Sequence, residues 1–133
     1  MGRIVDGIPA TVAGSVNESV LAYLRDLSAH SDVASALTDA LAPLGDVQIF
    51  SPDYGRYRYV AAASQGVVFA FAVGMGLVGF RLDPKQHGRA LASGAETASQ
   101  AGADWAVFTL FRDNWPLPDL RFWARKAYVN ARG

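Results

Sequence analysis

Five basic side chains stand where they could contact the phosphates of a nucleic acid. Arg56 and Arg58 alternate with two tyrosines in a segment predicted to be extended, so the arginines would share one face and the tyrosines the other. Cations beside stacking rings are typical of proteins that bind single strands. Arg121, Arg125 and Lys126 form the outer face of a predicted C-terminal helix. Together these five residues make up a nucleic-acid-binding hypothesis.

Each group also has a structural explanation. Charges on an edge strand block aggregation while its tyrosines pack against the core. Cations near a helix C-terminus stabilise the helix dipole. The pattern alone leaves both explanations open.

A second hypothesis places a small-ligand pocket on one face of the predicted sheet. Its wall would be aromatic and would carry one cation, which suits an apolar anion. The side chains expected on this face are Tyr57, Tyr59, Phe69, Phe71 and Arg81. A third hypothesis is a homodimer that buries an exposed sheet edge or the loop Trp115-Pro116-Leu117.

No residue set predicts catalysis, a metal site or a cofactor. The chain has no cysteine, and its two histidines, His30 and His87, show no ligand spacing. Pro52-Asp53 is shared with a metal-dependent nuclease motif, but residues 57–82 supply no further carboxylate and no lysine. The run Gly74 to Gly79 matches G-x-G-x-x-G, yet it leads into a predicted strand and not into the helix that a dinucleotide site requires.

Composition predicts a cytoplasmic protein with one domain over residues 1–133. No residue from Val60 to Phe80 is charged, but internal glycines and a Ser-Gln-Gly turn favour strands over a membrane-spanning helix. The net charge of zero hides an uneven distribution. Residues 1–53 hold two basic and seven acidic side chains, whereas residues 54–133 hold ten basic and five acidic ones. Such a split predicts either an anion-binding half or attraction between the two halves.

The elements predict an α+β fold: an antiparallel sheet of four to five strands, two N-terminal helices and two later helices. Residues 1–14 would form an arm or a small hairpin. Three consecutive strands span residues 54–82, with three-residue loops at 64–66 and 74–76. In that register Phe71 faces Gly79, and Phe69 faces Arg81. The remaining predictions are helices from about 16 to 27, 32 to 43, 85 to 100 and 118 onward, and strands at 47–50 and 105–111.

Several short motifs resemble the TfoX N-terminal domain and its YjbR/MmcQ-like relatives over roughly residues 37–131. They are Leu41-x-x-Leu44-Gly45-x-Val47, Tyr54-Gly55, Gly66-Val67-Val68-Phe69-Ala70, Leu77 to Arg81, and Leu120-x-x-Trp123-Ala124-Arg125-Lys126-Ala127. The chain has Ser51-Pro52-Asp53 where that family usually has Met-Phe-Gly. The resemblance implies a small α+β domain tied to competence-type regulation, with nucleic-acid or protein binding and no catalytic residues. We therefore expect a non-enzymatic regulatory or interaction domain.

Overall fold

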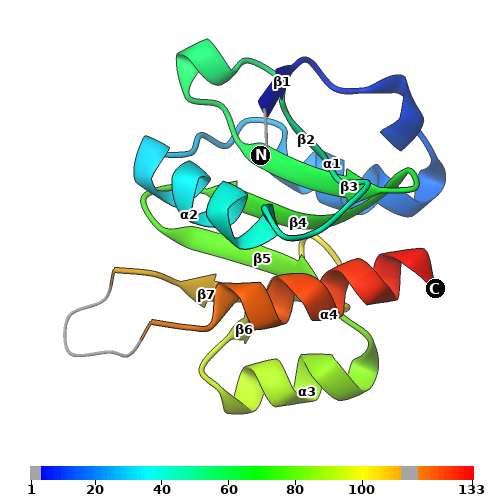
Figure 1. The fold of residues 1–133 in the computed structure, drawn as a ribbon, viewed down its shortest axis with the longest axis vertical. Coiled ribbons are helices and arrows are strands. Elements are labelled where there is room, and N and C mark those ends of the chain that lie inside the picture. Colours follow the sequence, from blue (N-terminus) through cyan, green and yellow to red (C-terminus); the bar gives the residue numbers. More distant parts are fainter. Residues whose placement is uncertain (1–3, 112–116) are drawn as a thin grey trace.

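A single seven-stranded sheet forms the centre of the molecule. The computed structural model describes residues 4–111 and 117–133. The strands lie in the order β1-β2-β3-β4-β5-β7-β6 (Figure 1), and every neighbouring pair is antiparallel except β1 and β2. Their bounds are β1 Ile4–Asp6, β2 Gln48–Ser51, β3 Val60–Ser64, β4 Val67–Val73, β5 Leu77–Arg81, β6 Glu96–Thr97 and β7 Trp105–Thr109. The α+β class is confirmed, and the predicted antiparallel strands correspond to β2, β3, β4, β5 and β7.

The two additional strands, β1 and β6, were not predicted. β1 has three residues and β6 has two, too few to show alternation. β1 pairs in parallel with β2, so residues 4–6 belong to the sheet and form neither a free arm nor a hairpin. The pattern cannot reveal such pairing, because β1 and its partner are separated by more than forty residues.

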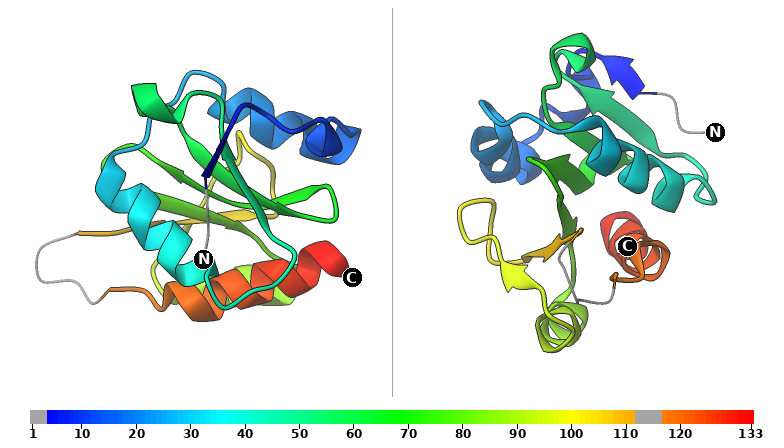
Figure 2. Two further views of the ribbon diagram at one scale, coloured as in Figure 1. Left: turned by 45° about the horizontal axis from the view of Figure 1, so that its top comes forward. Right: turned by 90° about the vertical axis from the view of Figure 1, so that its left-hand side faces the viewer.

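Helices cover both faces of the sheet. α2 (Ser31–Leu41) and α4 (Leu120–Arg132) lie on one face, and α1 (Glu18–Leu24) lies on the other (Figure 2, right). α3 (Pro84–Ala92) lies at the end of the sheet formed by β7 and β6, alongside α4. Three short 3-10 turns accompany these elements, at Ala10–Val12, Ser15–Asn17 and Tyr54–Arg56. Two earlier and two later helices are therefore present in the described chain, as predicted.

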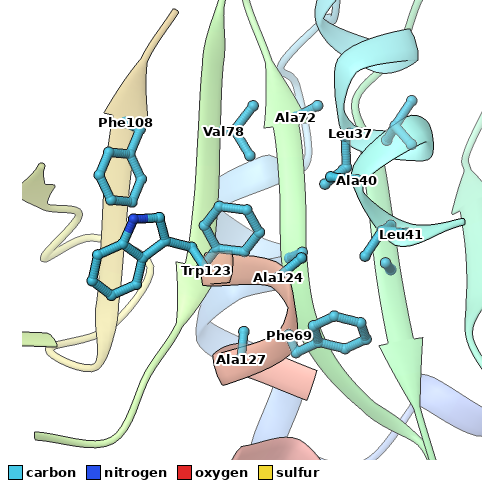
Figure 3. Packing of buried hydrophobic residues seen from close by; sticks show 14 of the residues in the cluster. Leu37, Ala40, Leu41, Phe69, Ala72, Val78, Phe108, Trp123, Ala124 and Ala127 are labelled. Atoms are coloured by element: carbon cyan, nitrogen blue, oxygen red, sulfur yellow. The ribbon is translucent and has the colours of Figure 1, made fainter. Parts of the chain in front are cut away.

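The face under α2 and α4 is closed by large apolar side chains from the helices and small ones from the central strands. Trp123 of α4 packs against Phe108 of β7, with 5.5 Å between ring centroids, while Ala124 and Ala127 approach the sheet closely (Figure 3). Leu37 of α2 packs nearby. Because β3 and β4 expose alanines toward this layer, both helices can lie close to the backbone.

The β4–β5 hairpin has the predicted register. Phe71 lies opposite Gly79, and the flanking pairs are Ala70–Phe80, Ala72–Val78 and Val73–Leu77. The Phe71 ring fills the space over Gly79: a Cβ added there would lie 2.3 Å from the ring. The β3–β4 turn is shorter than predicted, since only Gln65 and Gly66 form it. Both have positive φ (52° and 79°), which is the two-residue type I′ geometry favoured by twisted hairpins.

A bulge in β4 overturns one part of the predicted register. Ala62 of β3 pairs with Ala70, but Ala63 pairs with Val68, so Phe69 is an extra residue on β4. An extra residue breaks the alternation of side chains between the two faces. Phe69 consequently packs beneath α4, with its ring centroid 6.0 Å from that of Tyr128, whereas Phe71 points to the opposite face. The predicted pairing of Phe69 with Arg81 is therefore absent.

α3 ends eight residues earlier than its predicted end near Gln100. The helix stops at Ala92, and Gly94 follows with φ of 103°. That left-handed conformation suits glycine and terminates a helix. Gly102, beyond the predicted end of the helix, lies in the turn before β7.

Candidate functional site

The N-termini of α3 and α4 are fixed in the same way. Asp83 precedes Pro84, and its carboxylate accepts a hydrogen bond of 2.8 Å from the backbone N–H of Gln86. At the start of α4, Asp119 accepts one of 3.1 Å from the N–H of Phe122. Both caps satisfy otherwise free backbone donors. These two carboxylates are thereby engaged at the helix ends.

Within their spans, α3 and α4 carry basic side chains and no acidic ones. Of the lysines and arginines on these two helices, only Arg132 forms an ion pair with a described residue, at 3.1 Å from Asp46. The other five cations form no ion pair within residues 4–111 and 117–133. They are Lys85 and Arg89 of α3, and Arg121, Arg125 and Lys126 of α4. We call this set the α3–α4 basic surface.

An exposed aromatic ring lies beside one of these cations, Lys126. Phe122 is 42% exposed, and its ring meets that of Trp123 edge-on, with 4.9 Å between centroids. The ammonium of Lys126 lies 5.2 Å from the Phe122 centroid. Trp123 is buried and anchors this side of α4. The arrangement offers a planar apolar surface, held in place from behind and flanked by positive charge.

The other two predicted phosphate contacts lie elsewhere. Arg56 belongs to the short turn after β2 and pairs with Asp53 at 3.5 Å. Arg58 lies just before β3, 3.8 Å from Asp26, and its guanidinium donates a hydrogen bond to the backbone oxygen of Arg25. Arg58 therefore lies beside the end of α1. The structure brings together Arg121, Arg125 and Lys126, and it does not bring Arg56 and Arg58 to them.

The predicted aromatic pocket does not form as one face. Tyr57 is 60% exposed with a left-handed backbone (φ 58°), while Tyr59 is buried. Phe69 lies beneath α4 because of the bulge, and Phe71 packs between Tyr23 and Trp105 on the α1 side. Side chains already fill the space over Phe71.

Arg81, the expected ligand-binding cation, is a buried structural group. Its Nε donates a 2.9 Å hydrogen bond to the carbonyl of Val68, and its guanidinium lies 5.0 Å from the Trp105 ring centroid. Asp104 is 3.5 Å from Nη1. Burial lowers the pKa of Arg81, and the nearby Asp104 carboxylate partly offsets this change. The contacts link β5 to β4 and to the start of β7.

An apolar surface that the sequence pattern does not predict lies at one end of the sheet. Tyr57, Met75 and Phe111, exposed by 60%, 73% and 56%, lie around His30 at the end of the sheet where β4 turns into β5. Two cavities of about 380 and 520 Å³ share His30 and Met75. We call these three apolar residues the hairpin-tip patch. Of the loop proposed for dimer contacts, Leu117 is exposed, while Trp115 and Pro116 lie outside the described residues.

The two histidines lie apart. His30 accepts a hydrogen bond at Nδ1 from the backbone N–H of Asp32, and His87 contacts the Thr97 hydroxyl at 3.2 Å. Across residues 4–111 and 117–133, no three His, Asp or Glu side chains are grouped as metal ligands. No helix in those ranges is both long and apolar enough to cross a membrane.

Lys85, Arg89 and Phe122 were also missed as site residues. A signal for the two cations was available: residues 84–95 contain no acid, which marks an unneutralised helix. Phe122 stands four residues before Lys126, a spacing that places both on one helix face.

Comparison of the chain with models of protein families gave no match, and neither curated proteins nor solved structures gave one. The resemblance to the TfoX N-terminal domain therefore stays a prediction.

Proposed function

We propose that this protein is a non-enzymatic regulatory domain that binds nucleic acid through the α3–α4 basic surface. The observation that supports the proposal most directly is a set of five cations on α3 and α4, two helices that contain no acid, with no ion pair to any residue of 4–111 or 117–133. Phosphate contacts of this kind supply most of the affinity for nucleic acids. The proposal keeps three of the five residues expected from the sequence and adds Lys85 and Arg89.

Phe122 favours a single strand over a duplex. A base can stack on an exposed ring only when the base is not stacked between its neighbouring bases, as it is in a duplex. The Lys126 ammonium beside the ring would then contact the adjoining phosphate. A duplex would engage the cations alone.

The test is fluorescence anisotropy of labelled single-stranded and duplex DNA across a salt series. On a single strand, each phosphate contact contributes about −0.7 to the slope of log affinity against log salt. Arg121→Gln, Arg125→Gln and Lys126→Gln should each make the slope shallower by about that amount. Arg56→Gln is the matched control, because its guanidinium is exposed and paired with Asp53. The proposal would be contradicted if Arg56→Gln reduced the salt slope by the same amount, or if the affinity did not depend on salt concentration.

Phe122→Ala separates stacking from charge. Loss of the ring should weaken single-strand binding by about 1–3 kcal/mol while leaving the salt slope unchanged. Duplex binding should change little. If both substrates lose affinity equally, the ring supports α4 and does not contact bases.

The hairpin-tip patch favours a second function, self-association as a homodimer. Exposed apolar residues grouped around cavities are common at protein interfaces. A dimer that buries Met75 should show a mass that rises with concentration in sedimentation equilibrium. A strict monomer at high concentration would count against this function.

A further inference from the structure

A separate cavity lies on the α1 side of the sheet, away from α4. Its volume is about 450 Å³, within the usual range for small-molecule sites. One part of its lining comes from the segment between Ile8 and Gly14, and Pro52 and Tyr59 also line it. α1 and its C-cap residue supply another part through side chains at i, i+3, i+4 and i+7, namely Glu18, Leu21, Ala22 and Arg25. The regular spacing shows that one face of this helix lines the cavity.

Tyr59 gives this cavity an unsatisfied polar group. The residue is 1% exposed and packs in the cluster that contains Val12 and Phe50. Its hydroxyl makes no hydrogen bond to any residue in the described part of the chain. In the described residues, the side-chain atoms that have no hydrogen-bond partner and no contact with solvent belong to Arg81, Gln86 and Trp105. The Tyr59 hydroxyl is not among them. The hydroxyl therefore keeps an open path through the cavity that it lines.

The protonation state of Tyr59 defines what it can bind. Burial raises the pKa of Tyr59 above its usual 10.0, and nearby Arg58 partly offsets the change. The phenol therefore stays protonated at neutral pH and can donate a hydrogen bond. A ligand that meets it must supply an acceptor.

Two charged residues mark the ends of the helical wall. Glu18 and Arg25 are seven residues apart, which separates them by about 10 Å along a helix. Neither forms an ion pair with a described residue. Leu21 and Ala22 between them are apolar. The cavity thus has one cationic end, one anionic end and an apolar middle.

We propose that this cavity binds a small apolar monocarboxylic acid. The carboxylate accepts hydrogen bonds from the Arg25 guanidinium and the Tyr59 hydroxyl, and the hydrocarbon part packs on Val12, Leu21 and Ala22. Glu18 at the far end disfavours a second negative charge, which excludes dicarboxylates. This site is independent of the α3–α4 basic surface.

The experiment is an NMR titration of the ¹⁵N-labelled full chain with octanoate, with octanol and succinate as comparison ligands. Octanoate should shift the amides of residues 8–25 and of Tyr59 in a saturable way. Octanol should bind about tenfold more weakly, because it lacks the charge-assisted bonds. Succinate should not bind. If octanoate causes no saturable shift at concentrations up to about 10 mM, the affinity is too weak for a specific site and the proposal is overturned.

Four variants assign the binding to named atoms. Ala22→Phe places a ring at the exposed rim and should abolish binding without loss of the folded spectrum. Arg25→Gln should weaken octanoate about tenfold and leave octanol unchanged, and Tyr59→Phe should weaken both ligands. Ser19→Ala, on an exposed position of α1 outside the cavity, should change nothing. Octanoate shifts that centre on Met75, or binding that survives Ala22→Phe, would overturn the site.

Discussion

Phe71 lies across Gly79 so closely that the two residues act as one packing unit. A methyl group at position 79 would meet the ring at 2.3 Å, and the ring is held between Tyr23 and Trp105. Gly79→Ala should therefore destabilise the fold by about 1–3 kcal/mol in urea unfolding, as overpacking usually does. The double variant Phe71→Leu/Gly79→Ala should cost less than the sum of the single changes.

Gly88 is the matched control. It lies in the middle of α3 with no atom within 4 Å of an added Cβ. Gly88→Ala should raise the free energy of unfolding by about 0.5–1 kcal/mol, because alanine favours the helix and loses less backbone entropy. Equal effects of the two substitutions would show that the ring over Gly79 can move aside.

Tyr59 should make stability depend on alkaline pH. Its pKa is raised in the folded protein, so the unfolded chain loses the phenolic proton first. The contribution to stability is complete below the unfolded pKa of about 10 and is lost as pH rises through the folded value. Urea unfolding measured from pH 8 to 11 should show this loss in the parent protein. Tyr59→Phe should flatten the curve above pH 10, and an unchanged curve would contradict the assignment.

At the scale of elements, Asn17 joins the N-terminal segment to the β3–β4 hairpin. Its side-chain amide donates to the carbonyls of Val12 and Gly66, at 2.9 and 2.8 Å, and accepts from the N–H of Val68 at 2.9 Å. The residue is fully buried. Asn17 directly precedes α1, so these three bonds fix where that helix begins.

Asn17→Ala should cost about 2–4 kcal/mol in the free energy of unfolding, because it leaves buried backbone groups unpaired. Asn17→Asp should cost more, since it replaces the donor by a buried charge. Both can be measured by urea unfolding. Ser19→Ala on the exposed side of α1 should change stability by less than about 0.5 kcal/mol. A small effect of Asn17→Ala would mean that water replaces the amide.

The sequence predicted the β4–β5 hairpin because its information is local. Large residues opposite small ones and a glycine at the turn define one register. The bulge at Phe69 could not be predicted, since it depends on how β3 and β4 both meet α4. Because the bulge was not predicted, Phe69 and Phe71 were both expected on one face of the sheet, whereas they lie on opposite faces. The predicted start of the first helix, near residue 16, also differs from the structure, because the side chain of Asn17 is directed into the core and α1 starts at Glu18.

At the scale of the whole molecule, the uneven charge and the hairpin-tip patch predict different kinds of self-association. Opposite charges attract less at high salt, whereas apolar contacts are not weakened by it. A dimer that forms through the hairpin-tip patch should therefore persist at 0.5 M NaCl. At that salt concentration, interactions between charges more than about 4–5 Å apart are screened. Sedimentation equilibrium at low and high salt distinguishes the two. Met75→Lys should abolish the salt-resistant dimer, and Arg89→Gln should not.

The candidate site could be predicted only in part at this scale. Helical spacing is enough to group Arg121, Arg125 and Lys126, because one helix holds all three. That Arg56 and Arg58 lie apart from these three residues could not be predicted, because their position depends on the tertiary fold. The same holds for α3, which comes beside α4 only through the order of β5, β7 and β6.

The position of β1 has a consequence for how the chain is assembled. β1 and Asn17 both come early in the sequence, but their partners, β2 and the β3–β4 turn, come tens of residues later. Strands β2 to β5 are joined by short connections and can pair as neighbours, which favours their early formation. We therefore expect the N-terminal segment to dock last, onto a completed sheet. Until it does, Phe50, Tyr59 and Phe71 face solvent, so amide protons in residues 4–24 should exchange through local opening well before those of the central strands.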